Sequence, residues 1–222
     1  HGASLPDVMG HWTKQADTVA LMTDLGDDKR LWTVRKRAPH SQLVLRIVEG
    51  AGIDVGTRLV RHPSIAAVAF TGSFKGGAAL QAEANARPQP IPFYGELGSI
   101  NPVVALPKAV AARGAELAQA LANSIGMGSG QFCTSPGVLL VFDDAASQDF
   151  VQSLKIALVA LTPHAMLTSA IRKGFDSGAA RLAANPRIRT LLAGDSGGPA
   201  PRPVLVETDA ASFVADHALR EE

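Results

Sequence analysis

An alternation of apolar runs, glycine-rich turns and helix-compatible stretches constrains the fold of this 222-residue chain more than any other feature. Leu43–Val48 and Ile65–Phe70 are apolar on both faces, and each is followed by a stretch compatible with a helix. The first helix is expected to begin with Asp54 as its cap and the second to cover residues 76–86. Such strands alternating with helices are typical of a parallel sheet covered by helices, so we expect an α/β fold.

The rest of the chain is patterned less evenly. Further extended segments are expected at 91–97, 102–106, 138–142 and 203–206, and helices at 107–125, 145–160 and 168–184. Residues 1–42 show neither the helical nor the strand period. We interpret them as a surface segment or an incomplete N-terminal element.

Composition excludes several classes of partner. The chain has 21 Lys and Arg against 20 Asp and Glu, without a basic cluster, which argues against nucleic-acid or anionic-membrane binding. Its longest apolar runs are too short to span a bilayer. The six histidines show no metal-ligand spacing, so no metal is expected. A single cysteine excludes an internal disulfide and fits a reducing, cytoplasmic location.

Two residues are candidates for catalysis. Cys133 lies between the glycine run of 126–130 and an apolar segment, where backbone amides can stabilise negative charge on sulfur or on a neighbouring oxyanion. The alternative is a small buried hydrophobic residue. Glu96 ends an apolar run, where a buried carboxylate suits a general base, and the alternative is a solvated acid at a strand end.

Two glycine-containing turns are candidates for phosphate binding. Gly50, Gly52 and Gly56 form G-x-G-x-x-x-G, one residue longer than the dinucleotide fingerprint. Gly72 and Ser73 end an apolar run and open a helix, where N–H groups and a hydroxyl can meet a phosphate. Taken singly, both segments are also compatible with ordinary turns.

The order of these motifs resembles the aldehyde dehydrogenase superfamily. Val60–Pro63, Val68–Ser73, Gly95–Pro102 and Gly130–Thr134 follow one another as in that family. The family's E-L-G-G-K-N-P is E-L-G-S-I-N-P here, and its G-Q-x-C-T is intact. This variant, with the lead-in Arg87–Pro92, is most similar to 2-oxoglutarate semialdehyde (2,5-dioxovalerate) dehydrogenases.

The resemblance implies a mechanism and two domains. Cys133 attacks an aldehyde, hydride passes to NADP or NAD, and Glu96 activates the water that hydrolyses the resulting thioester. Residues 1–97 would form a partial Rossmann-like cofactor domain and residues 98–222 a truncated catalytic domain. The implied partners are a small-molecule aldehyde and, in the full-length form, further copies of the chain in a homo-oligomer. The implied cofactor-binding residues are Gly50, Gly52, Gly56, Gly72, Ser73 and Leu97.

The chain also departs from the family pattern. The family's oxyanion asparagine has no counterpart before the cofactor sheet, and Lys36 lies too close to Phe70 to be the family's ribose lysine. We therefore interpret residues 1–42 as divergent. Glu222 matches the glutamate of the family's E-x-F-G-P, and we interpret the chain as a fragment. Two alternatives follow: a catalytically incomplete remnant that only associates with other chains, and a cofactor-independent esterase.

Overall fold

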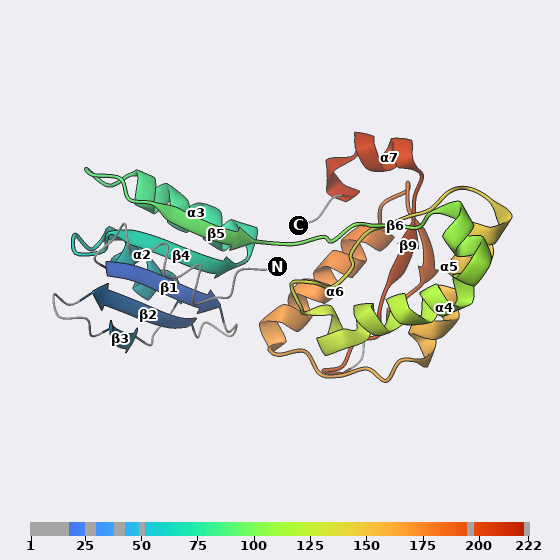
Figure 1. Ribbon diagram of the computed structural model, residues 1–222, viewed down its shortest axis with the longest axis horizontal. Coiled ribbons are helices and arrows are strands. Elements are labelled where there is room, and N and C mark those ends of the chain that lie inside the picture. Colours follow the sequence, from blue (N-terminus) through green and yellow to red (C-terminus); the bar gives the residue numbers. More distant parts are fainter. Residues whose placement is uncertain (1–17, 25–29, 38–42, 49–51, 195–197, 220–222) are drawn as a thin grey trace. The chain divides into compact units, whose positions relative to one another are not determined.

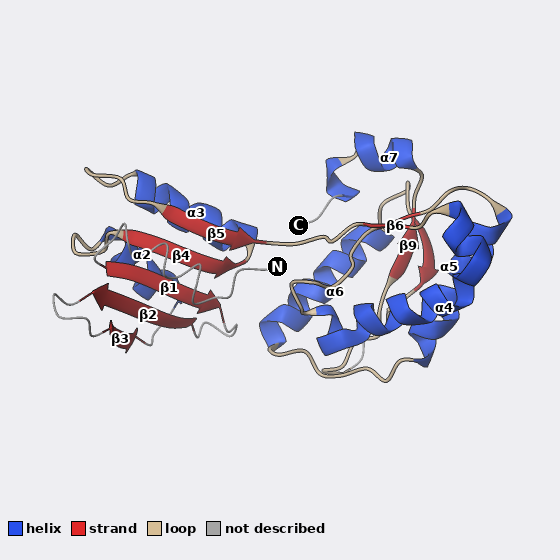
Figure 2. Cartoon of the chain, viewed as in Figure 1, coloured by secondary structure: helices blue, strands red, loops and turns tan. Residues whose placement is uncertain are grey.

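The computed structural model divides into two compact units, His1–Gly98 and Ser99–Glu222. It describes residues 18–24, 30–37, 43–48, 52–194 and 198–219, and only the backbone of those up to 52. Each unit combines helices with strands, which confirms the α/β class (Figure 2). The cofactor and catalytic roles expected for the two parts of the chain stay predictions.

A five-stranded sheet organises the first unit (Figure 1). Its order is β3-β2-β1-β4-β5. Pairs β1–β4 and β4–β5 are parallel, whereas β2 is antiparallel to both of its neighbours. The sheet is therefore mixed, with β2 as the one reversed strand that the apolar pattern did not predict. The strands are β1 Thr18–Asp24, β2 Arg30–Arg37, β3 Leu43–Val48, β4 Ala67–Gly72 and β5 Phe93–Leu97.

Residues 1–42, whose sequence shows neither the helical nor the strand period, contain the two strands β1 and β2. β1 and β2 form an antiparallel pair in which Thr18 is opposite Lys36 and Asp24 is opposite Arg30. β1 then lies beside β4, with Val19 opposite Ala67. The order of the sheet, which the charge-dense local sequence does not reveal, places this hairpin between β3 and β4.

Helices α2 (Gly52–Arg61) and α3 (Phe74–Asn85) share one core with β4. β4 lies between two parallel neighbours, and its residues 67–70 are all buried. Asp54 lies in the first turn of α2, after the helix has begun, which corrects the cap expected there. The buried core consists of Val60, Ile65, Val68, Phe70, Leu80 and Ala84.

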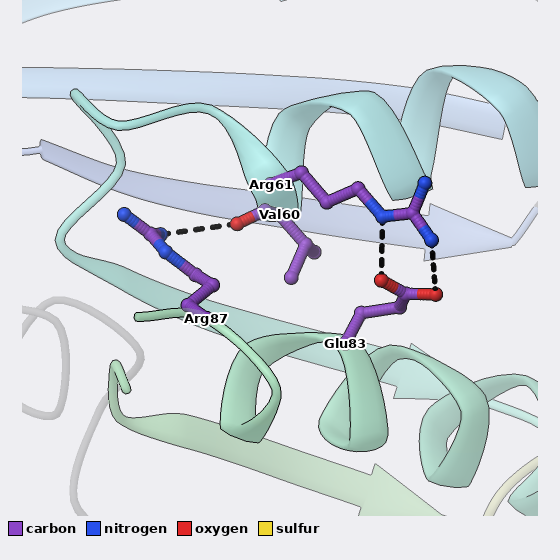
Figure 3. Close-up of polar contacts among 4 residues, drawn as sticks. All are labelled: Val60, Arg61, Glu83 and Arg87. Atoms are coloured by element: carbon purple, nitrogen blue, oxygen red, sulfur yellow. Dashed lines mark hydrogen bonds and ion pairs between the residues drawn. The ribbon is translucent and has the colours of Figure 1, made fainter. Parts of the chain in front are cut away.

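Two arginines connect the end of α2 to the chain around α3 (Figure 3). Arg61 donates two hydrogen bonds to Glu83 of α3, at 2.6 and 2.8 Å. Arg87 donates to the carbonyls of Val60 and Ile65, at 3.0 and 2.8 Å. Carbonyls at a helix C-terminus lack helical partners, so Arg87 stabilises the end of α2 as well as the turn into β4.

The second unit contains four α-helices among its described residues, with two small two-stranded sheets (Figure 1). β6 and β7 pair in parallel, and β8 and β9 pair antiparallel. The elements are β6 Val103–Val104, α4 Pro107–Gly126, η1 Met127–Gly130, β7 Leu139–Leu140, α5 Ala145–Ala160, α6 Ser169–Ala183, β8 Arg189–Leu192, β9 Leu205–Glu207, α7 Ala210–Ala215 and η2 His217–Leu219.

Helices α4 and α5 form the core of the second unit. Small residues Ala118 and Ala122 of α4 are buried beside Phe150 and Leu154 of α5. The strand expected at 138–142 is shorter than predicted and is not a buried one: only Leu139–Leu140 pairs, and Phe142 is 55% exposed. Apolar sequence alone therefore overstated the burial of this segment.

Candidate active site

Cys133 lies in a tight turn that follows α4 and the short helix η1. Gly128, Ser129 and Gly130 have φ values of 57°, 57° and 75°. At Gly128 a Cβ would also lie 2.7 Å from the ring of Phe132, so both the backbone and the neighbouring ring favour glycine there. The Ser135 N–H donates to the Phe132 carbonyl at 3.0 Å, which closes a turn with Cys133 inside it and its thiol exposed.

The segment before Cys133 is attached to a distant loop. Gln131 accepts a hydrogen bond from the Leu167 N–H at 2.8 Å and donates to the Gly128 carbonyl at 2.6 Å. Ser129 Oγ donates to the His164 carbonyl at 2.8 Å. The side chain of Gln131, one of the residues of G-Q-x-C-T, thus joins the segment directly before Cys133 to residues 164–167.

A second set of contacts holds the other side of the turn. The Cys133 carbonyl accepts hydrogen bonds from Ser99 Oγ and Asn101 Nδ2, both at 2.7 Å. Asn101 Nδ2 also donates to the Ser135 carbonyl at 2.9 Å. No role was predicted for Ser99 or Asn101 from the sequence. The available signal was the hydroxyl of Ser99, which lies in a glycine-containing turn where the resembling motif has a second glycine.

Glu96 lies in β5, opposite Thr71 of β4. Its side chain is exposed, which agrees with the solvated acid at a strand end and not with the buried carboxylate, the two interpretations that the sequence allows. Side chains alternate between the faces of a strand, and the neighbouring Leu97 packs against the core shared with α3. Glu96 therefore lies on the sheet face opposite that core, open to solvent in this unit.

The expected phosphate-binding residues lie mainly at the ends of strands. Gly72 ends β4, and Ser73 caps α3, accepting a hydrogen bond from the Gly76 N–H at 3.2 Å. Gly52 begins α2 and Gly56 is buried within it, whereas Gly50 lies outside the described residues. Strands β3 and β4 run in the same direction, so α2 and α3 both begin at the carboxyl edge of the sheet, where dinucleotides bind in open α/β folds.

Leu97 packs into a notch on α3. An added Cβ at Gly77 would lie 2.1 Å from Leu97 Cδ2 and 2.8 Å from Cδ1, so helix and strand approach closely only because residue 77 is glycine. Among the aromatic residues near the candidate site, Phe93 stacks on Phe70 with ring centroids 6.4 Å apart, which makes it a core residue. Phe132 is 54% exposed.

The second unit has a broad cavity of about 2060 Å³. Residues of α5, α6, β7, β8 and β9 line it, together with Ser129 and Gly130 from the loop before the cysteine. Cys133 is not among the lining residues. The cavity therefore borders the segment before Cys133 without including Cys133 in its lining.

Catalytic candidates Glu96 and Cys133 belong to different units, and their meeting in one cleft stays a prediction. Glu222 lies outside the described residues. Within the described ranges, no three His, Cys, Asp or Glu side chains form a group able to hold a metal ion. In the same part of the chain, every helix is too short or too polar to cross a membrane.

Comparison with known proteins gives a consistent picture. The model of the aldehyde dehydrogenase family matches residues 31–175. Alpha-ketoglutaric semialdehyde dehydrogenase 2 of Azospirillum brasilense is 41% identical over 186 residues, covering 81% of this chain and 34% of that protein. The alpha-ketoglutaric semialdehyde dehydrogenase of Acinetobacter baylyi is 44% identical over 127 residues, covering 57% of this chain and 24% of that protein. The chain thus spans about a third or less of these relatives.

Solved structures show the same fold. An NAD-dependent benzaldehyde dehydrogenase from Corynebacterium glutamicum has a TM-score of 0.62 at 23% identity, covering 75% of this chain and 37% of that one. An indole-3-acetaldehyde dehydrogenase in complex with NAD+ has a TM-score of 0.61 at 22% identity, covering 78% and 36%.

Proposed function

Because the chain belongs to the aldehyde dehydrogenase family, we propose that its complete protein oxidises an aldehyde to a carboxylate with NAD(P)+. The substrate we propose is 2-oxoglutarate semialdehyde. It is supported by the variant E-L-G-S-I-N-P and by relatives of 41% and 44% identity whose names carry that substrate. The observation that carries the proposal is an exposed thiol in a hydrogen-bonded turn, on the motif G-Q-F-C-T.

The candidate cofactor residues fit a dinucleotide. Helices α2 and α3 begin at the same sheet edge, and the first N–H groups of a helix bind phosphates well. Gly52 and Gly56 of α2 and Gly72 and Ser73 at the start of α3 would hold NAD(P)+ there, with Leu97 toward the nicotinamide. When bound, NAD(P)+ supplies the acceptor for the hydride of the substrate.

The chain's own residues account for the remaining steps. The sulfur of Cys133 adds to the aldehyde carbon and the thiol proton passes to the carbonyl oxygen, which gives a thiohemiacetal. This becomes a thioester when its carbon has given up a hydride and its hydroxyl has given up a proton to solvent. Glu96 takes a proton from water, the hydroxide attacks the thioester carbon, and the carbon–sulfur bond breaks to release the carboxylate.

Kinetic variants test the proposal on the complete protein. We expect Cys133→Ser to abolish NAD(P)H formation from 2-oxoglutarate semialdehyde. We expect Glu96→Gln to keep a burst of up to one NAD(P)H per chain but to slow turnover by a factor of about 10² or more, because the thioester is no longer hydrolysed. Glu116→Gln, at an exposed carboxylate of α4, is the control and should match the unaltered protein. Full turnover in Cys133→Ser would refute the assignment.

Substrate and cofactor choice need separate measurements. The proposal predicts a higher kcat/KM for 2-oxoglutarate semialdehyde than for phenylacetaldehyde, the substrate in the name of a relative of 33% identity. Titration with NADP+ and with NAD+ should raise the melting temperature, since a ligand that binds only the folded state stabilises it. No shift at millimolar concentrations of either would favour a remnant that only associates with other chains.

We also propose that the complete protein is cytoplasmic and forms a homo-oligomer. A reducing compartment is compatible with the single cysteine of this chain, which cannot form a disulfide within these 222 residues. Light scattering after size-exclusion chromatography measures the oligomeric state, and a monomer at micromolar concentration would contradict the proposed homo-oligomer.

A further inference from the structure

The carbonyl of Cys133 accepts two side-chain hydrogen bonds beside the candidate nucleophile. It accepts from Ser99 Oγ and from Asn101 Nδ2, both at 2.7 Å, while Asn101 Nδ2 reaches the Ser135 carbonyl at 2.9 Å. Three hydrogen bonds therefore run from one short loop, residues 98–101, to the turn that carries the thiol.

The backbone of this loop is shaped for these contacts. Gly98 and Asn101 have φ values of 59° and 45°, in the left-handed region that glycine and asparagine tolerate best. The Gly137 N–H donates to the Ile100 carbonyl at 2.7 Å, and a Cβ on Gly137 would lie 2.9 Å from that oxygen. The loop and the thiol turn thus meet backbone to backbone, which brings the side chains of Ser99 and Asn101 within reach of the Cys133 carbonyl.

We propose that Ser99 and Asn101 are positioning residues for Cys133. The peptide bond that joins Cys133 to Thr134 is planar and trans, so fixing its carbonyl also fixes the Thr134 N–H, which points the opposite way. The same two hydrogen bonds restrict the Cα of Cys133 and hence the position from which its sulfur attacks. Covalent catalysis depends steeply on such placement. The catalytic part of this inference rests on the proposed aldehyde oxidation.

Ser99 is the more informative of the two. Glycine, which stands at this place in the E-L-G-G-K-N-P motif, has no side-chain donor, so the Ser99 hydroxyl adds a contact specific to the variant in this chain. Asn101 makes two hydrogen bonds from a left-handed backbone, and its removal risks local unfolding. Ser99→Ala removes the hydrogen bond to the Cys133 carbonyl and leaves the backbone conformation available.

Hydrogen exchange tests the positioning without any cofactor. In the chain as it is, Ser99→Ala should raise the exchange rates of the amides of Cys133, Thr134, Ser135 and Gly137 about fivefold, the effect of losing one net hydrogen bond. Ser99→Thr, which keeps the hydroxyl, should restore the original rate. Ser153→Ala is the matched control, because Ser153 Oγ also donates to a carbonyl, that of Asp149, but within α5. Exchange in Ser99→Ala within twofold of the unaltered chain would overturn the proposal.

Kinetics of the complete protein test the catalytic consequence. Ser99→Ala should lower kcat about five- to tenfold with KM for the aldehyde unchanged, and Ser99→Thr should recover it. The shape of the pH–rate profile should not change, since Ser99 does not titrate. An unchanged kcat in Ser99→Ala would refute the positioning role. The two tests can give different answers. If the complete protein oxidises no aldehyde but Ser99→Ala still exchanges faster at residues 133–137, the proposed function is refuted and the contact between Ser99 and the Cys133 carbonyl is supported.

Discussion

Replacing Gly77 by alanine tests the packing between α3 and β5. The added Cβ would lie 2.1 Å from Leu97 Cδ2 and 2.8 Å from Cδ1, so the whole end of the leucine side chain must move. Forcing an extra methyl group into a packed site costs about 1–3 kcal/mol. Alanine in a helix interior recovers about 0.8–1 kcal/mol over glycine. We therefore expect Gly77→Ala to destabilise the first unit by about 1 kcal/mol.

Gly174→Ala is the matched control. Gly174 lies within α6, and a Cβ there has no heavy atom within 4 Å, so only the helix-propensity gain of about 1 kcal/mol remains. Native-state hydrogen exchange of the α3 and α6 amides measures the two changes separately, since each helix belongs to its own unit. Exchange should become faster in α3 of Gly77→Ala and slower in α6 of Gly174→Ala.

A double-mutant cycle identifies the clashing partner. In a Leu97→Ala background the space beside Gly77 is open, and Gly77→Ala should then stabilise α3 as Gly174→Ala stabilises α6. The coupling energy should be about 1–3 kcal/mol, the size of the overpacking cost. If Gly77→Ala alone stabilises α3, the close approach of Leu97 to the helix is incorrect.

Three further changes test the ion pair and the capping of the core helices. Hydrogen bonding to Arg61 lowers the pKa of Glu83 in the folded chain. Near that pKa the folded chain therefore binds fewer protons than the unfolded chain, so the ion pair stabilises the fold at neutral pH. This stabilisation is lost as pH falls through the lowered pKa. In urea titrations at a series of pH values, Glu83→Gln should therefore be less stable than the unaltered chain at neutral pH and equal to it in strong acid. Asp144 caps α5 through the Ser147 N–H at 2.8 Å, and Asp144→Ala should lower the free energy of unfolding by about 1 kcal/mol at pH 7. The buried Oγ of Ser147 has no hydrogen-bond partner among the described residues, so Ser147→Ala should leave the urea midpoint unchanged or raise it, and a loss above about 1 kcal/mol would contradict this.

Sequence periodicity anticipated the elements whose burial depends on local pattern. Leu43–Val48 and Ala145–Ala160 have the predicted bounds. The strand is a short apolar run that ends at a glycine-rich turn, and the helix begins directly after a capping aspartate. The strand Arg30–Arg37 was missed because its charges argue against a strand. It forms a strand because it pairs with both β1 and β3. Arg189–Leu192 is too short for any period to show.

The candidate site divides in the same way. The turn around Cys133 could be predicted because the glycine run of 126–130 and the motif G-Q-x-C-T are both local in the sequence. The donors to the Cys133 carbonyl lie 32 and 34 residues away in the sequence. They belong to the motif E-L-G-S-I-N-P, but nothing in that motif reveals that their side chains reach the turn around Cys133. The exposure of Glu96 depends on which face of β5 meets the helices, which the short run before it does not reveal.

The thiol turn is tied to residues on both sides of it in the chain, to Ser99 and Asn101 before it and to His164 and Leu167 after it. During synthesis, the turn leaves the ribosome some thirty residues ahead of its second set of tethers. Until Leu167 has emerged and packed, the turn around Cys133 in a nascent chain has only the contacts with Ser99 and Asn101 and lacks those with residues 164–167. The final geometry around the sulfur is therefore acquired late, only when both flanking segments have been made and packed.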